Sequence, residues 1–162
     1  MPIDAHQHFW TYDEAEYGWI AEGGLRALER DFLPDDLRPL LDQRGVDGTV
    51  AVQARQDLEE SEWLLGLADD HLWIRGVVGW VDLASGEVEA QLDRLAAARG
   101  GERLVGIRHV VQDEAAGFLD GADFRRGVAA VGGVVVAHPV AASLFHGPKL
   151  VVEDGLRPFA RI

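Results

Sequence analysis

Short apolar runs of strand length alternate with helix-like segments along most of this 162-residue chain. The runs cover residues 2–8, 48–52, 74–81 and 104–111, and a shorter one covers residues 133–137. Near-continuous apolar runs bounded by glycine predict strands that are buried on both faces. Such strands occur in parallel sheets covered by helices. The alternation therefore predicts an α/β fold built on a parallel sheet.

The segments between the runs place apolar residues at helical spacing, over residues 31–45, 57–71, 85–99 and 118–131. Pro34 at a first helical position and Gly45 just past the last turn mark the ends of the first helix. Ser85 is expected to cap the third helix. Residues 9–30, the aromatic segment, are rich in Trp and Tyr. We expect this segment either to form a lid or substrate wall, or to plug one end of the core.

Composition narrows the classes of function. The hydrophobic content of 48% is enough for one domain with a real core. A formal charge of -13 disfavours nucleic acid and anionic membranes as partners. The chain has no cysteine, so any metal must be held by nitrogen and oxygen ligands. We see no signal-peptide pattern and no apolar run long enough to span a membrane, and we expect a cytoplasmic protein.

Polar residues follow the runs at the points where the predicted strands end. His6 and His8 lie two residues apart, so on a strand they project from one face about 7 Å apart. Two such imidazoles can ligate one divalent metal, hold a substrate oxygen or transfer a proton, and otherwise they are polar rim residues. In parallel α/β folds this C-terminal edge of the sheet is where active sites form.

Four phrases of the sequence resemble a known family. They are residues 3–10 (IDAHQHFW), 50–54 (VAVQA), 79–82 (GWVD) and 106–112 (GIRHVVQ). In this order they are similar to the amidohydrolase-related sugar lactonases, the fuconolactonase and rhamnonolactonase group. The resemblance implies a partial (β/α)8 TIM barrel of the amidohydrolase type, about the first four to five β/α units. It covers residues 1–131, and residues 132–162 form a divergent or truncated tail with one further strand candidate.

The resemblance also implies an activity, the opening of a sugar lactone by water attack on its carbonyl. It assigns catalytic roles at the barrel mouth to His6, His8, Arg108 and His109. The forked cation of Arg108 suits the negative charge that develops during attack. Adjacent strand residues point to opposite faces, so only one of Arg108 and His109 is expected to reach the mouth. The substrate-binding residues implied are Trp10, Gln53, Arg55 and Trp80.

The same resemblance leaves the cofactor and the base open. His6 and His8 would hold one divalent metal such as zinc, but a catalytic zinc usually takes three protein ligands, and family members differ in metal use. The histidine and aspartate that the family supplies from later strands have no clear counterpart here. His138 is a candidate replacement for the histidine. Carboxylates near strand ends that could act as a base are Asp82, Asp113 and Glu114.

An incomplete barrel exposes unpaired strand edges, so we expect this chain to self-associate. Two other classes of function remain open. One is a catalytically inactive half-barrel remnant or ligand-binding protein. The other is another amidohydrolase-type hydrolase or decarboxylase.

Overall fold

The computed structural model describes residues 2–112, 114–133 and 149–153 of the chain. A five-stranded parallel sheet forms its centre, and the strands follow one another in the order β1-β2-β3-β4-β5. In this arrangement each strand lies beside the next one along the chain, which is the order expected for successive β/α units of a barrel. The strands are β1 (Ile3–Gln7), β2 (Gly48–Val52), β3 (Ile74–Gly79), β4 (Leu104–Val110) and β5 (Lys149–Glu153).

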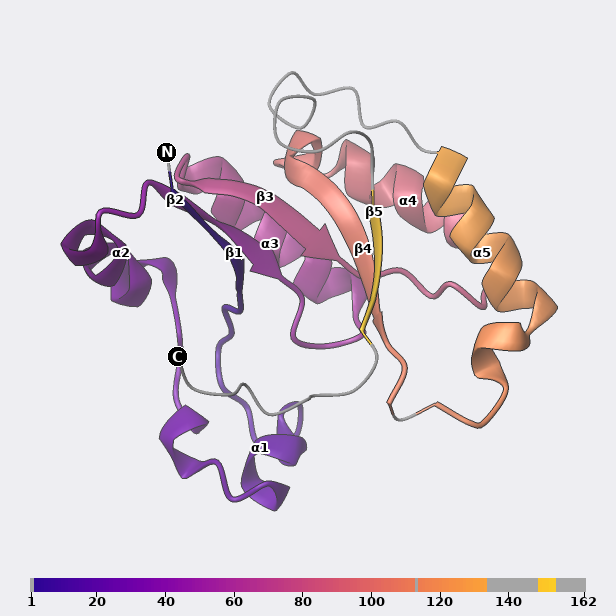
Figure 1. The fold of residues 1–162 in the computed structure, drawn as a ribbon, viewed down its shortest axis with the longest axis horizontal. Coiled ribbons are helices and arrows are strands. Elements are labelled where there is room, and N and C mark those ends of the chain that lie inside the picture. Colours follow the sequence, from indigo (N-terminus) through magenta and orange to yellow (C-terminus); the bar gives the residue numbers. More distant parts are fainter. Residues whose placement is uncertain (1, 113, 134–148, 154–162) are drawn as a thin grey trace.

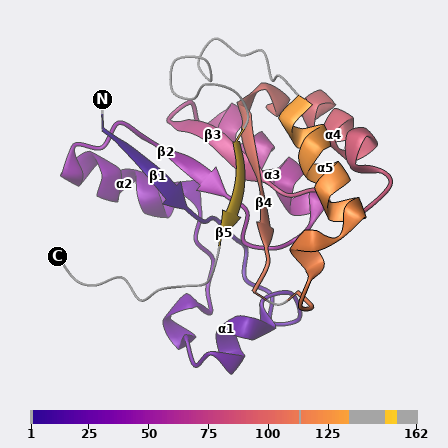
Figure 2. The ribbon, with the colours of Figure 1, turned by 45° about the vertical axis from the view of Figure 1, so that its right-hand side comes forward.

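Helices α3, α4 and α5 cover one face of the sheet, and α2 lies beside β1 (Figures 1 and 2). The segment that contains α1 lies beyond the arrowheads of the strands, at the C-terminal edge of the sheet (Figure 1). The α-helices are α1 (Gly18–Glu22), α2 (Pro34–Arg44), α3 (Leu58–Asp70), α4 (Val88–Ala97) and α5 (Ala122–Gly133). Short 3₁₀ helices are η1 (Arg26–Leu28), η2 (Gly101–Arg103) and η3 (Phe118–Asp120).

Local sequence signals fix the ends of α2 and α3. Pro34 opens α2, and the Asp36 side chain accepts a hydrogen bond from the backbone N–H of Leu33 at 2.9 Å. Gly45 ends α2 with a φ of 66°, a left-handed conformation that glycine adopts without strain. Asp57 caps α3 by accepting the Glu59 backbone N–H at 2.9 Å.

The main core lies between the sheet and the three covering helices. Leu64, Leu65, Ile74 and Leu95 are fully buried there, and each such side chain contributes about 1.5–3 kcal/mol to folding. A smaller apolar cluster of Val50, Val52 and Val78, with Ile3 and Val105 against it, lies apart from the main core. The central strands therefore carry buried apolar side chains on both faces, as their near-continuous apolar sequences predict.

Most predicted elements are confirmed, with differences at their ends. The third helix begins at Val88 rather than at Ser85, whose hydroxyl instead accepts the Glu87 backbone N–H at 3.0 Å in the preceding turn. The segment predicted as one helix over residues 118–131 divides into η3 and α5. Of the fifth run, residues 133–137, Gly133 ends α5 and residues 134–137 lie outside the described residues. The fifth strand of the sheet is β5, over residues that the sequence analysis assigns to the tail without predicting a strand there.

The aromatic segment builds a small core of its own at the strand ends. Trp10, Tyr17 and Ile20 are buried together, and Tyr12 and Leu28 pack against them. The Trp10 ring donates its Nε1–H to the Arg30 carbonyl at 2.9 Å. The aromatic segment therefore closes one end of the fold, which is one of the two alternatives predicted.

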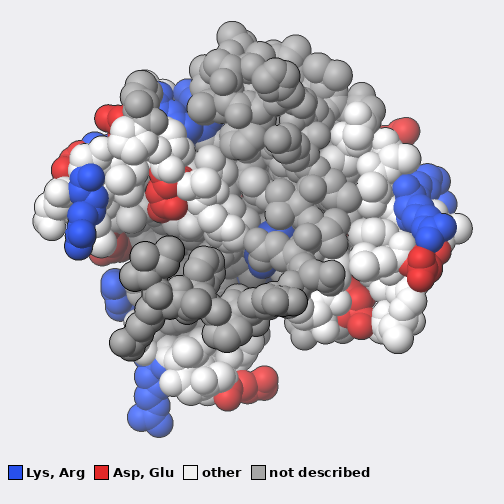
Figure 3. Space-filling view, viewed as in Figure 1, with Lys and Arg blue, Asp and Glu red and all other residues white. Residues whose placement is uncertain are grey.

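The surface charges are interspersed in the part of the chain that the structure describes. Over α5, basic and acidic groups lie side by side (Figure 3), where Arg125 pairs with Asp120 and Arg126 with Asp123. None of the described helices combines the length and the apolar character that crossing a bilayer requires.

Candidate active site

His6 and His8 converge at the end of β1. His6 lies within the strand and His8 directly follows it. Their Nε2 atoms are 3.1 Å apart, and the ring centroids are 4.9 Å apart at an interplanar angle of 74°. The spacing of two residues thus brings both imidazoles to one face, as predicted.

The backbone of β2 determines the tautomer of His8. Nδ1 of His8 is 2.9 Å from the Val52 carbonyl oxygen, which can only accept a hydrogen bond. Nδ1 must therefore carry the proton, and in the neutral ring Nε2 is then the unprotonated nitrogen. A histidine ligand is commonly oriented by such a carbonyl on its other ring nitrogen.

The histidine pair fits part of a metal site. Two nitrogen ligands of a tetrahedral zinc lie about 3.3 Å apart, close to the 3.1 Å between the two Nε2 atoms. Within residues 2–112, 114–133 and 149–153, no group of three or more His, Cys, Asp or Glu side chains could hold a metal ion. His6 and His8 could therefore supply two ligands of a metal site, not a full set.

Arg108 lies on β4 and interacts with the loop after β2. Its guanidinium Nη1 donates to the Gln53 carbonyl at 3.1 Å, and the Gln53 side-chain amide donates back to the Arg108 carbonyl at 3.3 Å. Gln53 is fully buried, whereas Arg108 is partly exposed. These reciprocal bonds join β2 to β4 across the end of β3. The Gln53 side chain is therefore buried below the C-terminal edge of the sheet, and the Arg108 side chain lies at that edge.

His109, the neighbour of Arg108, makes its contacts on the helical side. Its ring stacks on Phe118 at a centroid distance of 5.1 Å and is 3% exposed. Nε2 lies 2.8 Å from a Glu114 carboxylate oxygen, and Nδ1 accepts the Trp80 indole N–H at 3.3 Å. Because the indole only donates, Nδ1 is unprotonated and Nε2–H donates to Glu114. His109 and Arg108 thus make their contacts on different sides of β4, as the strand alternation predicts.

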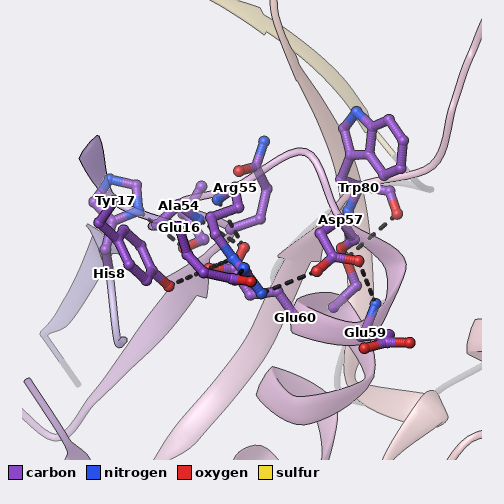
Figure 4. A network of polar contacts seen from close by, with 12 residues as sticks. His8, Glu16, Tyr17, Ala54, Arg55, Asp57, Glu59, Glu60 and Trp80 are labelled. Atoms are coloured by element: carbon purple, nitrogen blue, oxygen red, sulfur yellow. Dashed lines mark hydrogen bonds and ion pairs between the residues drawn. The ribbon is translucent and has the colours of Figure 1, made fainter. Parts of the chain in front are cut away.

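A charged network surrounds the loop between β2 and α3 (Figure 4). Arg55 pairs with Glu16 and, at 2.9 Å, with Asp57. Glu60 is 3% exposed, and its Oε2 accepts the backbone N–H groups of Ala54 and Arg55 at 3.0 and 2.8 Å. The network therefore fixes both the side chain of Arg55 and the backbone that carries it.

Burial shapes the acidity of this network. Burial raises the pKa of the Glu60 carboxyl, and the backbone N–H groups of Arg55 and Ala54 oppose that rise. The Tyr17 hydroxyl donates to Glu60 at 3.2 Å, and burial together with the Glu60 charge raises the pKa of Tyr17 well above its ordinary value. A cavity of about 220 Å³ adjoins the network, lined by Thr11, Glu16, Tyr17, Arg55, Glu59, Glu60 and Trp63.

Sequence reasoning missed Glu60 and the role of Tyr17. The signal available was Asp57-x-x-Glu60, the spacing of a helix capping box. That pattern predicts an N3 carboxylate that turns back to the N-cap backbone. Glu60 instead reaches the two residues at positions 54 and 55, outside the helix, which only the path of the loop determines.

The three carboxylates predicted as candidate bases, and the candidate histidine His138, lie in different parts of the chain. Asp82 accepts the backbone N–H of Ala84 at 3.1 Å and so stabilises the turn after β3. Glu114 is hydrogen-bonded to His109. Asp113 and His138 lie outside the described residues.

A parallel sheet of successive β/α units, with polar side chains gathered at the carboxyl ends of its strands, is the architecture of (β/α)8 barrel proteins, whose active sites lie at that edge. The sequence model of the amidohydrolase family matches residues 3–146. The chain belongs to this family.

Two curated relatives are L-fucono-1,5-lactonases. The protein from Burkholderia multivorans is 47% identical over 131 residues, which are 80% of this chain and 43% of that protein. The protein from Burkholderia ambifaria is 42% identical over 111 residues, 68% of this chain and 37% of that protein. The chain thus spans less than half the length of these relatives. It corresponds to the N-terminal half of the family fold.

Solved structures give the same result. A Burkholderia multivorans amidohydrolase crystallised with bound zinc superposes with a TM-score of 0.74 at 46% identity, over 82% of this chain and 45% of that one. A probable 2-pyrone-4,6-dicarboxylic acid hydrolase from Acinetobacter baumannii shares the fold, with a TM-score of 0.57 at 14% identity over 80% of this chain and 45% of that one. The partial amidohydrolase barrel predicted from the sequence is confirmed.

Proposed function

We propose that this chain carries the N-terminal half of a site that hydrolyses sugar lactones of the fuconolactone and rhamnonolactone type. One observation carries the proposal: His8 and Arg108 are bound to the successive carbonyls of Val52 and Gln53 at the C-terminal edge. Two groups suited to a lactone carbonyl are thus held next to each other. The lactonase relatives, at 42–47% identity, support the choice of substrate class.

The reaction adds water to the lactone carbonyl carbon and breaks the ring C–O bond. The ring oxygen leaves as a hydroxyl, and the product is the open hydroxy acid. Negative charge grows on the carbonyl oxygen during attack, and the guanidinium of Arg108, which lies at this edge, is suited to stabilise it. His6, whose ring meets that of His8, would orient the same oxygen or relay a proton.

We propose that His6 and His8 also hold a divalent metal such as zinc, together with a further ligand from outside the described residues. A bound zinc polarises a carbonyl and lowers the pKa of bound water. The bound zinc of the Burkholderia multivorans amidohydrolase supports this assignment. Metal-independent hydrolysis is the alternative, and a chelator distinguishes the two.

The four residues predicted to bind substrate divide by exposure. Arg55 and Trp80 are partly exposed, and we propose that they contact sugar hydroxyls and the sugar ring. Trp10 and Gln53 are buried, and the Trp10 indole N–H and the Gln53 side-chain NH2 donate to backbone carbonyls, so we propose that they support the site from beneath. His109, with both ring nitrogens hydrogen-bonded, would act by orienting Trp80 rather than by touching substrate.

A hydrolysis assay tests the proposal. The purified chain is offered sugar lactones and, as a comparison, acids without a lactone ring, with and without a chelator. We expect lactone opening that His6→Ala abolishes and that His71→Ala, a histidine at the end of α3, leaves unchanged. Hydrolysis of the non-lactone substrates alone would favour another amidohydrolase activity. Lactone binding without turnover would favour a ligand-binding remnant.

We further propose that the chain self-associates. In the described sheet β1 is paired on one side only, with β2. An open edge of this kind pairs with another strand when one is offered. Sedimentation at micromolar concentration should show a dimer or larger species, and a stable monomer would contradict the proposal.

A further inference from the structure

Residues 52–55, the 52–55 segment, run from the last residue of β2 into the loop before α3 and contact both proposed catalytic groups. The Val52 carbonyl is 2.9 Å from Nδ1 of His8, and the Gln53 carbonyl accepts Nη1 of Arg108 at 3.1 Å. These carbonyls fix the plane of the imidazole and the direction of the guanidinium. Any shift of the 52–55 segment therefore moves both groups.

The other half of the 52–55 segment is held by a single buried carboxylate. Glu60, in the first turn of α3, accepts the N–H groups of Ala54 and Arg55 on the same oxygen, Oε2. Its other oxygen accepts the hydroxyl of Tyr17 at 3.2 Å. Figure 4 shows these bonds meeting between the aromatic segment and the start of α3.

Glu60 is not needed to cap its own helix. Asp57 already caps α3 by accepting the Glu59 N–H. A buried carboxylate is also a poor choice for stability, and the raised pKa of Glu60 shows that burial disfavours its charged form. Its hydrogen bonds to consecutive backbone groups are charge-assisted, shorter and more directional than neutral ones. Such bonds hold the backbone of the 52–55 segment in a defined position.

We propose that Glu60 is a positioning residue: it clamps the 52–55 segment and thereby sets the orientation of His8 and Arg108 at the strand ends. The use of those two groups on a lactone rests on the proposed function. The clamp itself does not.

The test compares Glu60→Gln with Glu59→Gln, which removes the same charge from an exposed neighbour on the same helix. The first readout is amide hydrogen exchange of Ala54 and Arg55 by NMR. We expect exchange about five- to tenfold faster in Glu60→Gln, because a neutral acceptor replaces a charged one, and no change in Glu59→Gln. Glu60→Ala should accelerate it further, and Glu60→Gln decides the question if the alanine variant does not fold.

The second readout is the ¹⁵N spectrum of His8. The wild-type chain should show the Nδ1–H tautomer, and Glu60→Gln should increase the Nε2–H form as the Val52 carbonyl moves away. Unchanged exchange at residues 54 and 55 together with an unchanged His8 tautomer would overturn the proposal. Exchange accelerated equally across the whole sheet would also overturn it, since Glu60 would then support the fold in general.

Activity provides a third readout. If the chain opens lactones, Glu60→Gln should lower kcat about tenfold with KM within about twofold, because misorientation acts on the transition state. An unchanged kcat would contradict the clamp. If the wild-type chain opens no lactone, the proposed function fails, and the exchange and tautomer results still decide the clamp.

Discussion

The face of the sheet beneath α3, α4 and α5 differs in kind from the C-terminal edge of the same sheet. Beneath the helices, fully buried Leu, Ile and Val side chains pack against one another. At the edge, the buried groups are Gln53, Glu60 and His109, each bound to a specific polar partner. Burial of apolar area stabilises the first region. In the second, hydrogen bonds offset the desolvation of polar groups and mainly fix directions.

This contrast predicts that stability depends mainly on the helical face and that the proposed activity depends on the edge. We expect the helical face to tolerate exchange of apolar side chains of similar volume, since hydrophobic packing is non-directional. The edge does not, because each group there has a defined donor or acceptor. Mutations in the two regions should therefore separate loss of activity from loss of stability.

The largest effect is expected from Arg108→Ala. Removing the cation proposed to stabilise the developing negative charge should lower kcat/KM for a lactone by about 100-fold or more. Arg125→Ala on exposed α5 is the control, and its activity should match that of the wild-type chain. Steady-state kinetics with thermal melts measure both effects. Full activity in Arg108→Ala would remove Arg108 from the site.

The next effect concerns the helical face. A Cβ on Gly127 would lie 2.0 Å from the backbone carbonyl oxygen of Leu83, so Gly127→Ala must push α5 away from the loop that follows β3. We expect a loss of about 1–3 kcal/mol in the free energy of unfolding, measured by denaturant titration. Gly132→Ala in the same helix meets no neighbour within 4 Å and should be neutral or stabilising. Equal effects at both positions would contradict close packing at this face.

The pH dependence of stability tests the edge. Burial raises the pKa of Glu60 in the folded chain, so between its ordinary value and the raised value the folded state holds a proton that the unfolded state has lost. Stability should therefore fall as pH rises through that window, by at most about 1.4 kcal/mol per pH unit. Glu60→Gln should flatten this part of the curve, and Glu59→Gln should retain it. Identical curves would show that Glu60 titrates normally.

The smallest effect is expected at the surface. Arg94 pairs with Glu62 between α4 and α3, and its hydrogen bond lowers the pKa of Glu62. Water and salt screen this exposed pair. Glu62→Gln should shift the melting midpoint by at most about 2 °C, and the shift should vanish in 1 M salt. A larger shift would show that this exposed ion pair stabilises the fold more than a screened surface pair should.

The elements could be predicted where local chemistry decides them. Pro34 and Gly45 mark the ends of α2, and the apolar runs mark the four strands from β1 to β4. β5 was missed because its short sequence, KLVVE, has charged residues at both ends and no local signal to set it apart from the tail. Its pairing with β4 is a long-range contact.

The site was predictable in part. The spacing of His6 and His8 suffices to place both rings on one side, since strand geometry alternates with a period of two. The substrate contact of Trp10 stays a prediction, and the structure adds that its ring is buried and that its indole N–H donates to the Arg30 carbonyl. Exposure of a ring depends on what packs over it, which no local pattern encodes.

By itself, the sequence determined the alternation of strands and helices, the edge at which polar groups gather and the family to which the chain belongs. These follow from short-range periodicity and from residue identity. Only the tertiary structure decided that Glu60 clamps residues 54 and 55, that His109 faces the helices, and that Arg108 and His8 share the 52–55 segment. The reason is physical, because a hydrogen bond between residues distant in sequence exists only once the chain has folded to bring donor and acceptor within about 3 Å.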